Sequence, residues 1–389
     1  MFIKTNIDQE SDAMFDERRT KDLKWERPYI VFWELTRACS LSCKHCRAEA
    51  ITKRNPNELT TEECFSLIEK MSEVKPLLIF TGGDPMMRDD IFEILSYAKE
   101  KNFRTAIAFS GTKKAAKKMG ELKEVGIDRI AVSIDGKKEV HDEFRGVEGA
   151  YEISIEVVEA AKSLDLSFQI NTTVTKETMK SLPDVAKLTL ELEADMWDVF
   201  FLVPTGRAKL DQMPSPQEFE DILCWLYDLS KFINVKSSAA THFRRIEIVR
   251  KMGKMPKVSS FYFDLLRSLE SMAKGRKAKE GKKVRIETLG VTDGRGIMFI
   301  SHVGEVYPSG FLPIVAGNVR EKDPLEIYKE SKIFIELRDP EKLKGKCGLC
   351  EFKKICGGSR ARAYAVFGDH LAEEPCCIHI PSKMYSTNR

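Results

Sequence analysis

Short apolar runs alternate with amphipathic segments from residue 29 to about residue 232. The apolar runs predict six strands, at residues 29–36, 77–80, 105–110, 129–134, 167–174 and 197–203. The segments between them have the periodicity of helices that bury one face, at residues 59–70, 89–101, 113–125, 150–164 and 179–193. Thr60 or Thr61 is the expected cap of the first helix, with Glu63 in its first turn. Strands and helices that alternate at this spacing indicate parallel βαβ units.

Six such units in succession favour an α/β fold, a partial (β/α)6 barrel of the TIM type, with functional residues in the loops that follow the strands. After residue 233 the alternation stops. Apolar runs at 296–302 and 305–308 predict a β-hairpin turned at Val303–Gly304, and residues 324–337 predict a helix. We therefore expect four parts, an N-terminal arm (1–28), the barrel (29–232), a connecting region (233–290) and a small cysteine-rich C-terminal domain (291–389).

The composition is that of an ordinary globular protein. The 389 residues are 42% hydrophobic and 32% charged, and the net charge of +3 does not by itself indicate nucleic-acid binding. No run of ~18 apolar residues predicts a transmembrane helix, and the N-terminus is too polar for a signal peptide. We expect a cytoplasmic protein with no nucleic-acid and no membrane partner. Most of the ten cysteines fall in two clusters with C-x-x-C spacing, which fits metal binding in a reducing compartment.

Three cysteines follow the first predicted strand. Cys39, Cys43 and Cys46 have the spacing C-x3-C-x2-C, and no fourth cysteine is near them in the sequence. A 4Fe–4S cluster normally takes four thiolates, so three would leave one iron with an open coordination position. The same residues could instead be three ligands of a zinc site with a distant fourth ligand, or three inert core thiols.

The spacing, together with the turns after later strands, resembles the radical SAM superfamily. Those turns are Thr81–Pro85, Ser110–Thr112, Ser133–Gly136 and His141–Gly146. The resemblance implies that Cys39, Cys43 and Cys46 carry a 4Fe–4S cluster whose open iron chelates S-adenosylmethionine (AdoMet). An electron from the cluster would then release a 5′-deoxyadenosyl radical.

The resemblance also implies which residues bind AdoMet. The turn of Gly82, Gly83, Asp84 and Pro85 would hold the methionine amino group, although Asp84 stands where glutamate is usual and is shorter by a methylene. Arg145 would pair with the methionine carboxylate, and Ser133 would bind the ribose. The remaining candidates are Ser110 in the third turn, Asn171 on the fifth strand and, along the adenine, His45, Leu202 and Val203.

The C-terminal cysteines form a second pattern. Cys347, Cys350 and Cys356 have the spacing C-x2-C-x5-C, and Cys376 and Cys377 follow. Alone, this pattern could be a zinc ribbon, but beside a radical SAM barrel it resembles the SPASM extension, which carries auxiliary 4Fe–4S clusters. The resemblance implies one auxiliary cluster, on Cys347, Cys350, Cys356 and Cys377, with Cys376 as the alternative last ligand. A second cluster would lack its thiolates, because the corresponding positions are Val291, Met298, Ser309 and Ser359.

Several longer runs resemble the group that contains the AhbD-type heme synthase and its NirJ-like relatives. They are 35–39, 169–175, 202–207, 300–306 and 359–364. The resemblance implies oxidative decarboxylation of porphyrin propionates in alternative heme biosynthesis. The substrate would be an iron porphyrin, and the electron donor a protein such as ferredoxin or flavodoxin. Candidate substrate residues are Arg207, His242 and Arg245, with Arg244 and the basic stretch 274–285 as further cations, although all of these could be surface charge.

Two other functions stay open at this point. SPASM-type maturases of peptides or of the tungsten cofactor share many of the same runs. An extra N-terminal peptide-binding module is usual in peptide maturases, and residues 1–28 are too short for a full one. A non-catalytic iron–sulfur or zinc scaffold is the alternative of another class, and Ser133 and Arg145 beside the three-cysteine motif argue against it.

Overall fold

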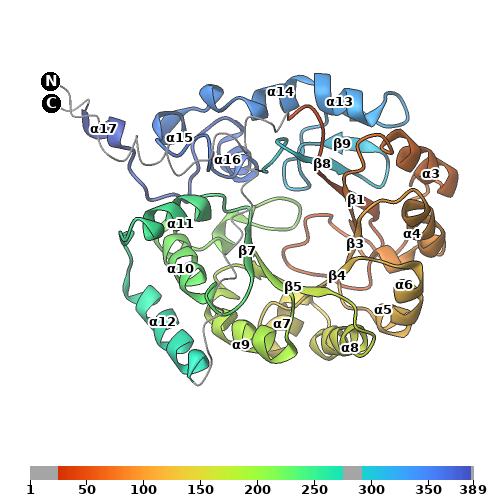
Figure 1. Cartoon of the computed structure of the whole chain (residues 1–389), viewed down its shortest axis with the longest axis horizontal. Coiled ribbons are helices and arrows are strands. Elements are labelled where there is room, and N and C mark those ends of the chain that lie inside the picture. The colour runs from red at the N-terminus through yellow and green to blue at the C-terminus, as the bar shows by residue number, and fades with distance from the viewer. Residues whose placement is uncertain (1–24, 275–290, 387–389) are drawn as a thin grey trace.

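The computed structural model describes residues 25–274 and 291–386, and its centre is one ten-stranded sheet (Figure 1). The strands lie in the order β10-β9-β8-β1-β2-β3-β4-β5-β6-β7. Strands β1 to β7 are parallel to one another. Their bounds are β1 Ile30–Thr36, β2 Leu77–Gly82, β3 Thr105–Phe109, β4 Arg129–Ser133, β5 Phe168–Val174, β6 Met196–Phe201 and β7 Val235–Ser238. The predicted α/β fold with a partial barrel is confirmed.

Helices cover the outer face of this sheet (Figure 1). They are α3 Thr61–Lys70, α4 Ile91–Glu100, α5 Lys113–Lys117, α6 Met119–Val125, α7 Lys138–Arg145, α8 Ala150–Ser163, α9 Leu182–Leu192 and α10 Pro216–Leu229. Thr60 caps α3 in a capping box with Glu63. Short 3-10 turns occur at Pro85–Met87, Met179–Ser181, Leu210–Gln212 and Pro340–Lys342.

Alternation along the strands separates the core from the inner face of the barrel. In β1, Val31, Trp33 and Leu35 are buried in the core that the helices cover. In β5, every second residue is buried, and the residues between them, such as Asn171, are only partly buried. Because neighbouring side chains of a strand point to opposite faces, the partly buried set lies on the inner face.

The region after residue 233 differs from the expectation. β7 continues the parallel sheet beside β6, and α11 Phe243–Lys251 and α12 Ser260–Ala273 follow it. Residues predicted to be a connecting region therefore add a seventh strand to the barrel. β7 reads Val-Lys-Ser-Ser, so it offers no apolar run. The basic stretch 274–285 lies, except for Lys274, outside the described residues.

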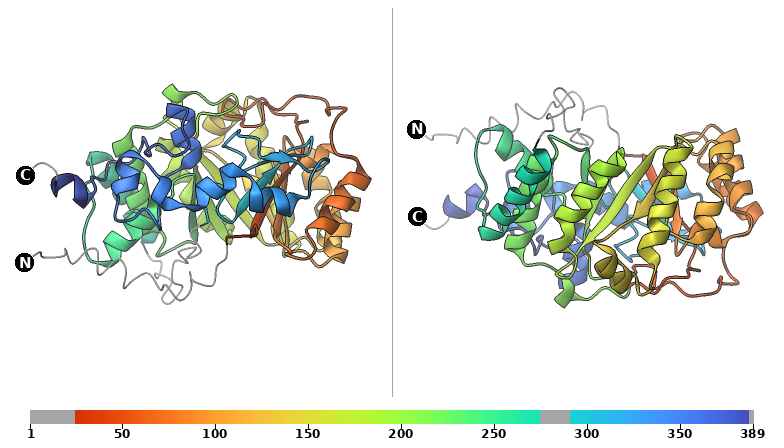
Figure 2. Two further views of the ribbon diagram at one scale, coloured as in Figure 1. Left: turned by 90° about the horizontal axis from the view of Figure 1, so that it is seen from above. Right: turned by 90° about the horizontal axis from the view of Figure 1, so that it is seen from below.

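The C-terminal part joins the same sheet at its other edge. β8 Ile297–Ile300 pairs in parallel with β1, and β9 Glu305–Tyr307 pairs with β8 in the predicted hairpin. The remaining elements are β10 Gly317–Asn318, α13 Pro324–Glu330, α14 Lys332–Arg338, α15 Gly345–Leu349, α16 Arg360–Phe367 and α17 Ser382–Ser386. The predicted helix 324–337 is thus two helices, separated at Ser331. Figure 2 shows these blue segments running along one side of the barrel, away from α8 and α9.

A bilayer-spanning helix would need a length and an apolar character that no helix in the described ranges has.

Candidate functional site

The three-cysteine motif lies in the loop between β1 and α3. Cys39 and Cys43 are 4% and 7% exposed and pack in a small apolar cluster of their own with Leu41 and Ala150. Main-chain N–H groups point at two of the sulfurs, from Leu41 to Cys39 Sγ at 3.4 Å and from Ala50 to Cys46 Sγ at 3.3 Å. Burial raises the pKa of Cys39 to about 11. N–H donors favour the anionic sulfur, so this loop is arranged to hold thiolates once a cation is bound.

The separation of the sulfurs distinguishes a cluster from a zinc ion. In a tetrahedral zinc site with Zn–S bonds of about 2.3 Å, neighbouring sulfurs lie ~3.8 Å apart. Within residues 25–274 and 291–386, the one group of three ligand atoms that all lie within 4.8 Å of one another belongs to Cys350, Glu351 and His379. The sulfurs of Cys39, Cys43 and Cys46 therefore do not all lie within 4.8 Å of one another. Wider spacing fits a four-iron cluster, in which each thiolate binds a different iron.

The turn after β2 is held against the cysteine loop by main-chain hydrogen bonds. Gly83 N donates to Thr36 O at 2.8 Å, and Asp84 N donates to Ala38 O at 2.7 Å. A Cβ atom on Gly83 would lie 2.4 Å from the carbonyl oxygen of Ala38. Only glycine allows this approach of the two loops, which places Asp84 beside the cysteines.

Asp84 is fully buried, and one of its two carboxylate oxygens accepts a main-chain hydrogen bond. Oδ1 accepts from Met86 N at 2.9 Å and so caps the 3-10 turn that Pro85 begins. Oδ2 has no partner within hydrogen-bond distance and angle, and burial raises the pKa of this carboxyl against the effects of Met86 N–H and the Thr112 side chain, which lower it. A buried acceptor without a partner is costly, so Oδ2 is suited to a ligand ammonium.

The ends of β3, β4 and β5 bring three further candidates to the same edge. Ser110 Oγ donates to Gly83 O at 3.0 Å and lies 3.8 Å from Cys39 Sγ. Ser133 is directly beside Asn171 in the register of β4 and β5. Asn171 Oδ1 accepts from Gln169 Nε2 at 2.7 Å. These side chains line the inner face where the strands end, which is where ligands bind in such barrels.

The side chain of Arg145 pairs with Asp135. Its Nε donates to Asp135 Oδ2 at 2.6 Å, and its Nη1 lies 3.9 Å from Cys43 Sγ. Asp135 also accepts from Thr173 N at 2.8 Å, and its own N–H donates to His141 Nδ1 at 3.1 Å. Burial lowers the pKa of His141 to about 4. Asp135 and His141 therefore order the turn, and Arg145 directs positive charge toward the cysteine loop.

His45 stacks on Phe144, with ring centroids 4.1 Å apart and an interplanar angle of 3°. Burial lowers its pKa to about 3, so the ring is neutral near pH 7, and its Nδ1 has no partner. Leu202 and Val203 are buried at the end of β6. The carbonyl of Leu202 accepts from Arg362 Nε at 3.1 Å, a contact that the sequence did not suggest.

Arg207 follows the same strand and reaches the cysteine loop. Its main-chain N donates to Cys46 O at 3.1 Å, and its Nη1 donates to Ala50 O at 3.4 Å. Gly206, with φ +61°, allows this contact, because a Cβ there would lie 2.4 Å from Arg47 O. Nε and Nη2 of Arg207 are buried without partners. They present a guanidinium edge that fits a carboxylate.

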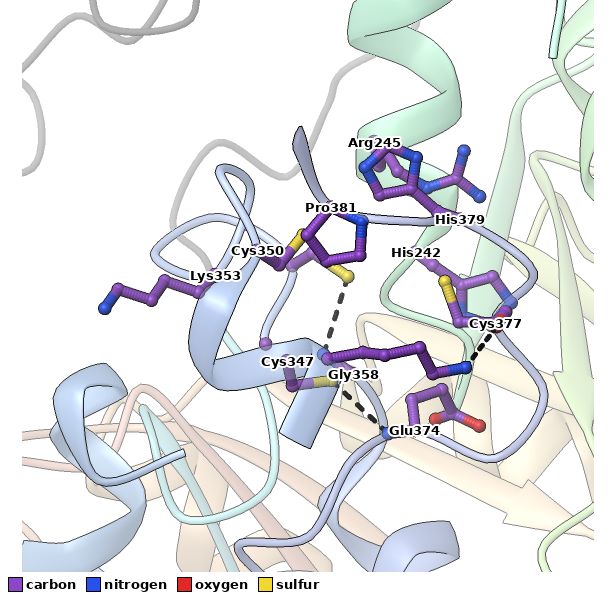
Figure 3. A pocket seen from close by; sticks show the side chains of 13 residues that line it. His242, Arg245, Cys347, Cys350, Lys353, Gly358, Glu374, Cys377, His379 and Pro381 are labelled. Atoms are coloured by element: carbon purple, nitrogen blue, oxygen red, sulfur yellow. Dashed lines mark hydrogen bonds between the residues drawn. The ribbon is translucent and has the colours of Figure 1, made fainter. Parts of the chain in front are cut away.

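The C-terminal cysteines line a pocket, the C-terminal pocket (Figure 3). It is lined by Cys347, Cys350, Cys356 and Cys377, together with His242 and Arg245. N–H groups point at three of these sulfurs, from Glu374 to Cys347 Sγ at 3.3 Å, from Phe352 to Cys350 Sγ at 3.4 Å and from Gly358 to Cys356 Sγ at 3.5 Å. Burial raises the pKa of Cys377 to about 12. Four thiols around one pocket, with N–H donors aimed at them, fit a 4Fe–4S cluster.

Cys376 and Cys377 have different surroundings. Cys377 lines the pocket, whereas Cys376 is 2% exposed and packs in the apolar core with residues of α10. The positions without cysteine have other roles. Ser359 Oγ accepts from Arg362 N at 3.2 Å and caps α16, Met298 is part of the main core, and Val291 and Ser309 are buried.

The candidate substrate residues divide between the two cysteine sets. Arg207 lies at the cysteine loop, but His242 and Arg245 line the C-terminal pocket. Arg245 is paired with Glu220, and Arg244 donates to the main-chain carbonyls of Ile355 and Val291. The contacts of Arg244 join α11 to the C-terminal part, whereas the pair of Arg245 and Glu220 joins α11 to α10.

Known proteins resemble the chain along most of its length. The family model described as Radical SAM superfamily matches residues 33–189. AdoMet-dependent heme synthase of Methanosarcina barkeri is 40% identical over 367 residues, which cover 92% of this chain and 98% of that protein. Pre-heme d1 synthase of Dinoroseobacter shibae is 29% identical, covering 90% and 85%, and PqqA peptide cyclase of Bradyrhizobium diazoefficiens is 24% identical, covering 95% and 90%.

Solved structures share the fold. SuiB of Streptococcus suis bound to its precursor peptide SuiA superposes with a TM-score of 0.66 at 15% identity, covering 95% of this chain and 79% of that chain. AdoMet-bound anSMEcpe gives 0.63 at 19% identity, covering 90% and 94%. Because the 40% identity extends over 92% of the chain and includes the matched radical SAM region, the chain belongs to the radical SAM superfamily, in the family of the AdoMet-dependent heme synthases.

Proposed function

We propose that this chain is an AdoMet-dependent heme synthase that oxidatively decarboxylates propionates of iron-coproporphyrin III. The observation that carries the proposal is the 40% identity to a heme synthase over almost the full length of both proteins. Identity to the peptide cyclase is 24%, which makes a peptide maturase the weaker candidate.

The cluster loop supports a radical reaction. When bound, a 4Fe–4S cluster and AdoMet supply an electron and a 5′-deoxyadenosyl radical. The chain's own residues hold the ligand. Asp84 Oδ2, buried and without a partner, would accept from the methionine ammonium, and Ser133 and Asn171 would meet the ribose side. His45, Leu202 and Val203 would line the adenine.

The proposed substrate reaction balances in atoms and electrons. Hydrogen-atom removal from the β-carbon of a propionate leaves a carbon radical, and the neighbouring carboxylate then departs as carbon dioxide. A vinyl group forms, and one electron remains that must leave the substrate. The auxiliary cluster in the C-terminal pocket is the proposed first acceptor, and a ferredoxin- or flavodoxin-like protein is the proposed donor to the first cluster.

The inner face of the barrel supports a flat, anionic substrate. Arg47, which follows Cys46, lies 4.6 Å above the ring of Phe299 and pairs with Glu34 at 2.7 Å. The rings of Phe200 and Phe311 lie 6.5 Å apart. The partly buried rings of Phe200 and Phe311 would offer a surface to a macrocycle, whereas Phe299 is buried beneath Arg47. The guanidinium edge of Arg207 would suit a propionate. The pattern in the sequence did not reveal Arg47, because its partners come from β1 and β8.

Anaerobic turnover tests the proposal. Purified protein, reductant, AdoMet and iron-coproporphyrin III should yield heme, with two molecules of carbon dioxide for each heme and 5′-deoxyadenosine in step with them. A PqqA-like peptide in place of the porphyrin should give no product. Radical formation with no loss of carbon dioxide from the porphyrin would refute the heme synthase function.

A further inference from the structure

His242 is a fully buried histidine whose ring makes no hydrogen bond. Its exposed fraction is 0%, and neither Nδ1 nor Nε2 has a partner. The ring lines the pocket of Cys347, Cys350, Cys356 and Cys377 (Figure 3). A buried polar group of this kind normally has a partner, so the missing partner belongs to whatever fills the pocket.

The neighbouring residues hold the His242 ring in place and influence its pKa. His242 immediately precedes α11, and its ring lies 6.2 Å from that of Phe219 at an angle of 22°. Its pKa is lowered to about 3, chiefly by burial and also by the nearby cations Arg245 and Arg362, against the effect of Glu374. Imidazole and imidazolium both carry an N–H group. In either tautomer a neutral ring carries one N–H donor.

We propose that His242 donates an N–H hydrogen bond to a sulfur atom of the auxiliary 4Fe–4S cluster and thereby raises its reduction potential. The inference rests on the proposed auxiliary cluster, although not on the identity of the substrate. The four cysteines already supply one thiolate for each iron, so the histidine is not needed as a ligand. A hydrogen bond to sulfur stabilises the reduced, more negative cluster. The main-chain donors of Glu374, Phe352 and Gly358 act in the same direction, and His242 adds a side-chain donor to them.

Redox titration of the auxiliary cluster tests the proposal. Cys39→Ala provides the background, so that the remaining cluster, about four irons per chain, is the one observed. His242→Phe keeps a ring but removes the N–H, and we expect a more negative midpoint potential with unchanged iron. His242→Gln restores an N–H donor and should return the potential toward the original value. His370→Phe is the matched control, because His370 pairs with Glu336, and should leave the potential unchanged.

Three outcomes of this titration would overturn the proposal. An unchanged potential in His242→Phe at full iron content would show that no hydrogen bond contributes. Loss of the four irons with the fold intact would make His242 a ligand. A Cys39→Ala protein without iron would remove the cluster on which the inference depends, whereas failure to convert the porphyrin would leave the titration unaffected.

A spectroscopic measurement keeps the test decisive if His242→Phe does not fold. In Cys39→Ala protein grown with 15N-histidine, the reduced cluster should show a weak hyperfine coupling to one histidine nitrogen. His379→Phe serves as the background, since His379 also lines the pocket. A strong coupling, typical of an iron–nitrogen bond, or no coupling at all would contradict the proposal.

Discussion

At the scale of single residues, the two cysteine sets share one physical design. Cys39 is buried, and Cys350 and Cys377 are partly buried. The pKa of each of these thiols lies above its ordinary range because burial disfavours the thiolate. Main-chain N–H groups nevertheless point at most of the sulfurs. Such thiols are poor nucleophiles without metal, and a bound cationic cluster would supply the charge that makes them ligands.

Removing one sulfur of the first set tests this design. Cys39→Ala should reduce 5′-deoxyadenosine formation to the level without enzyme, because only two ligands then remain for the cluster. Iron should fall by about four atoms per chain. Cys64→Ala is the matched control, since Cys64 is fully buried in the core beside α4 and should leave both values unchanged. Cleavage of AdoMet at the normal rate in Cys39→Ala would contradict the assignment of the loop.

Arg207 carries the prediction about the substrate carboxylate. Arg207→Lys keeps the charge but removes the fork of Nε and Nη2, which have no partner within the described chain. Because a charge-assisted hydrogen bond contributes about 1.5–3 kcal/mol, KM for the porphyrin should rise roughly tenfold or more. The affinity for AdoMet should not change. Arg267→Lys, at an exposed pair with Asp264, should have no effect on either. Weaker AdoMet binding with an unchanged porphyrin KM would place the methionine carboxylate, not a propionate, at Arg207.

At the scale of secondary-structure elements, α16 is joined to the ends of β6 and β7 through one buried arginine. Arg362 donates to the carbonyls of Phe201, Leu202 and Ala239 and pairs with Glu374 at 3.0 Å. Glu374 in turn accepts from Ser359 N and Cys376 N. The segment that carries the second cysteine set is thereby held against the edge proposed for the adenine.

Breaking this pair should destabilise the whole chain. Arg362→Met leaves Glu374 as an unpaired buried charge, so we expect a loss of about 3–5 kcal/mol in the free energy of unfolding. Lys344→Met, which removes an exposed pair with Asp369 in the same part of the chain, should cost at most about 1 kcal/mol. Urea unfolding of the three proteins gives the comparison. Equal, small losses in both variants would show that the buried pair does not contribute as described.

The elements that the sequence predicted are those whose signal is local. Apolar residues mark each of the first six strands, as a run in most of them and in alternation in β5, and Thr60 with Glu63 marks the start of α3. β7 was missed because Val235 is its one apolar residue, and its place is fixed by pairing with β6. Serine at position 331 and lysine at position 118 separate helices that periodicity alone joins.

The same distinction applies to the candidate site. The spacing of Cys39, Cys43 and Cys46 is local, so the motif was visible in the sequence. The contacts of Arg362 and Arg47, and the position of His242 in the C-terminal pocket, join segments far apart in the chain. No local pattern encodes them, because they depend on which strand ends the fold brings together.

At the scale of the whole molecule, one sheet connects the two cysteine sets. β1 leads into the first cysteine loop, and β8 of the C-terminal part pairs with β1 in parallel. On the other side of the sheet, α11 follows β7, and His242 and Arg245 at the start of α11 line the C-terminal pocket. The C-terminal part is therefore attached to the barrel at both edges, which gives the two proposed clusters a fixed relative position.

The adjacent pair Cys376 and Cys377 gives the sharpest test of the cluster count. The intact protein should contain about eight irons per chain, from two four-iron clusters. Cys377→Ala should lower this number to about four, because Cys377 lines the C-terminal pocket. 5′-Deoxyadenosine should still form, because the first cysteine set is unchanged. Heme formation should fall, since the electron left on the substrate would then lack its proposed acceptor.

Cys376→Ala is the matched control for that loss. Its side chain packs in the apolar core, so iron and heme formation should both be retained, at a cost of about 1 kcal/mol in stability. Iron loss from Cys376→Ala and not from Cys377→Ala would exchange the two assignments. About twelve irons in the intact protein would mean a third cluster, which would require ligands other than the buried Met298 and the helix-capping Ser359 that now stand at the corresponding positions.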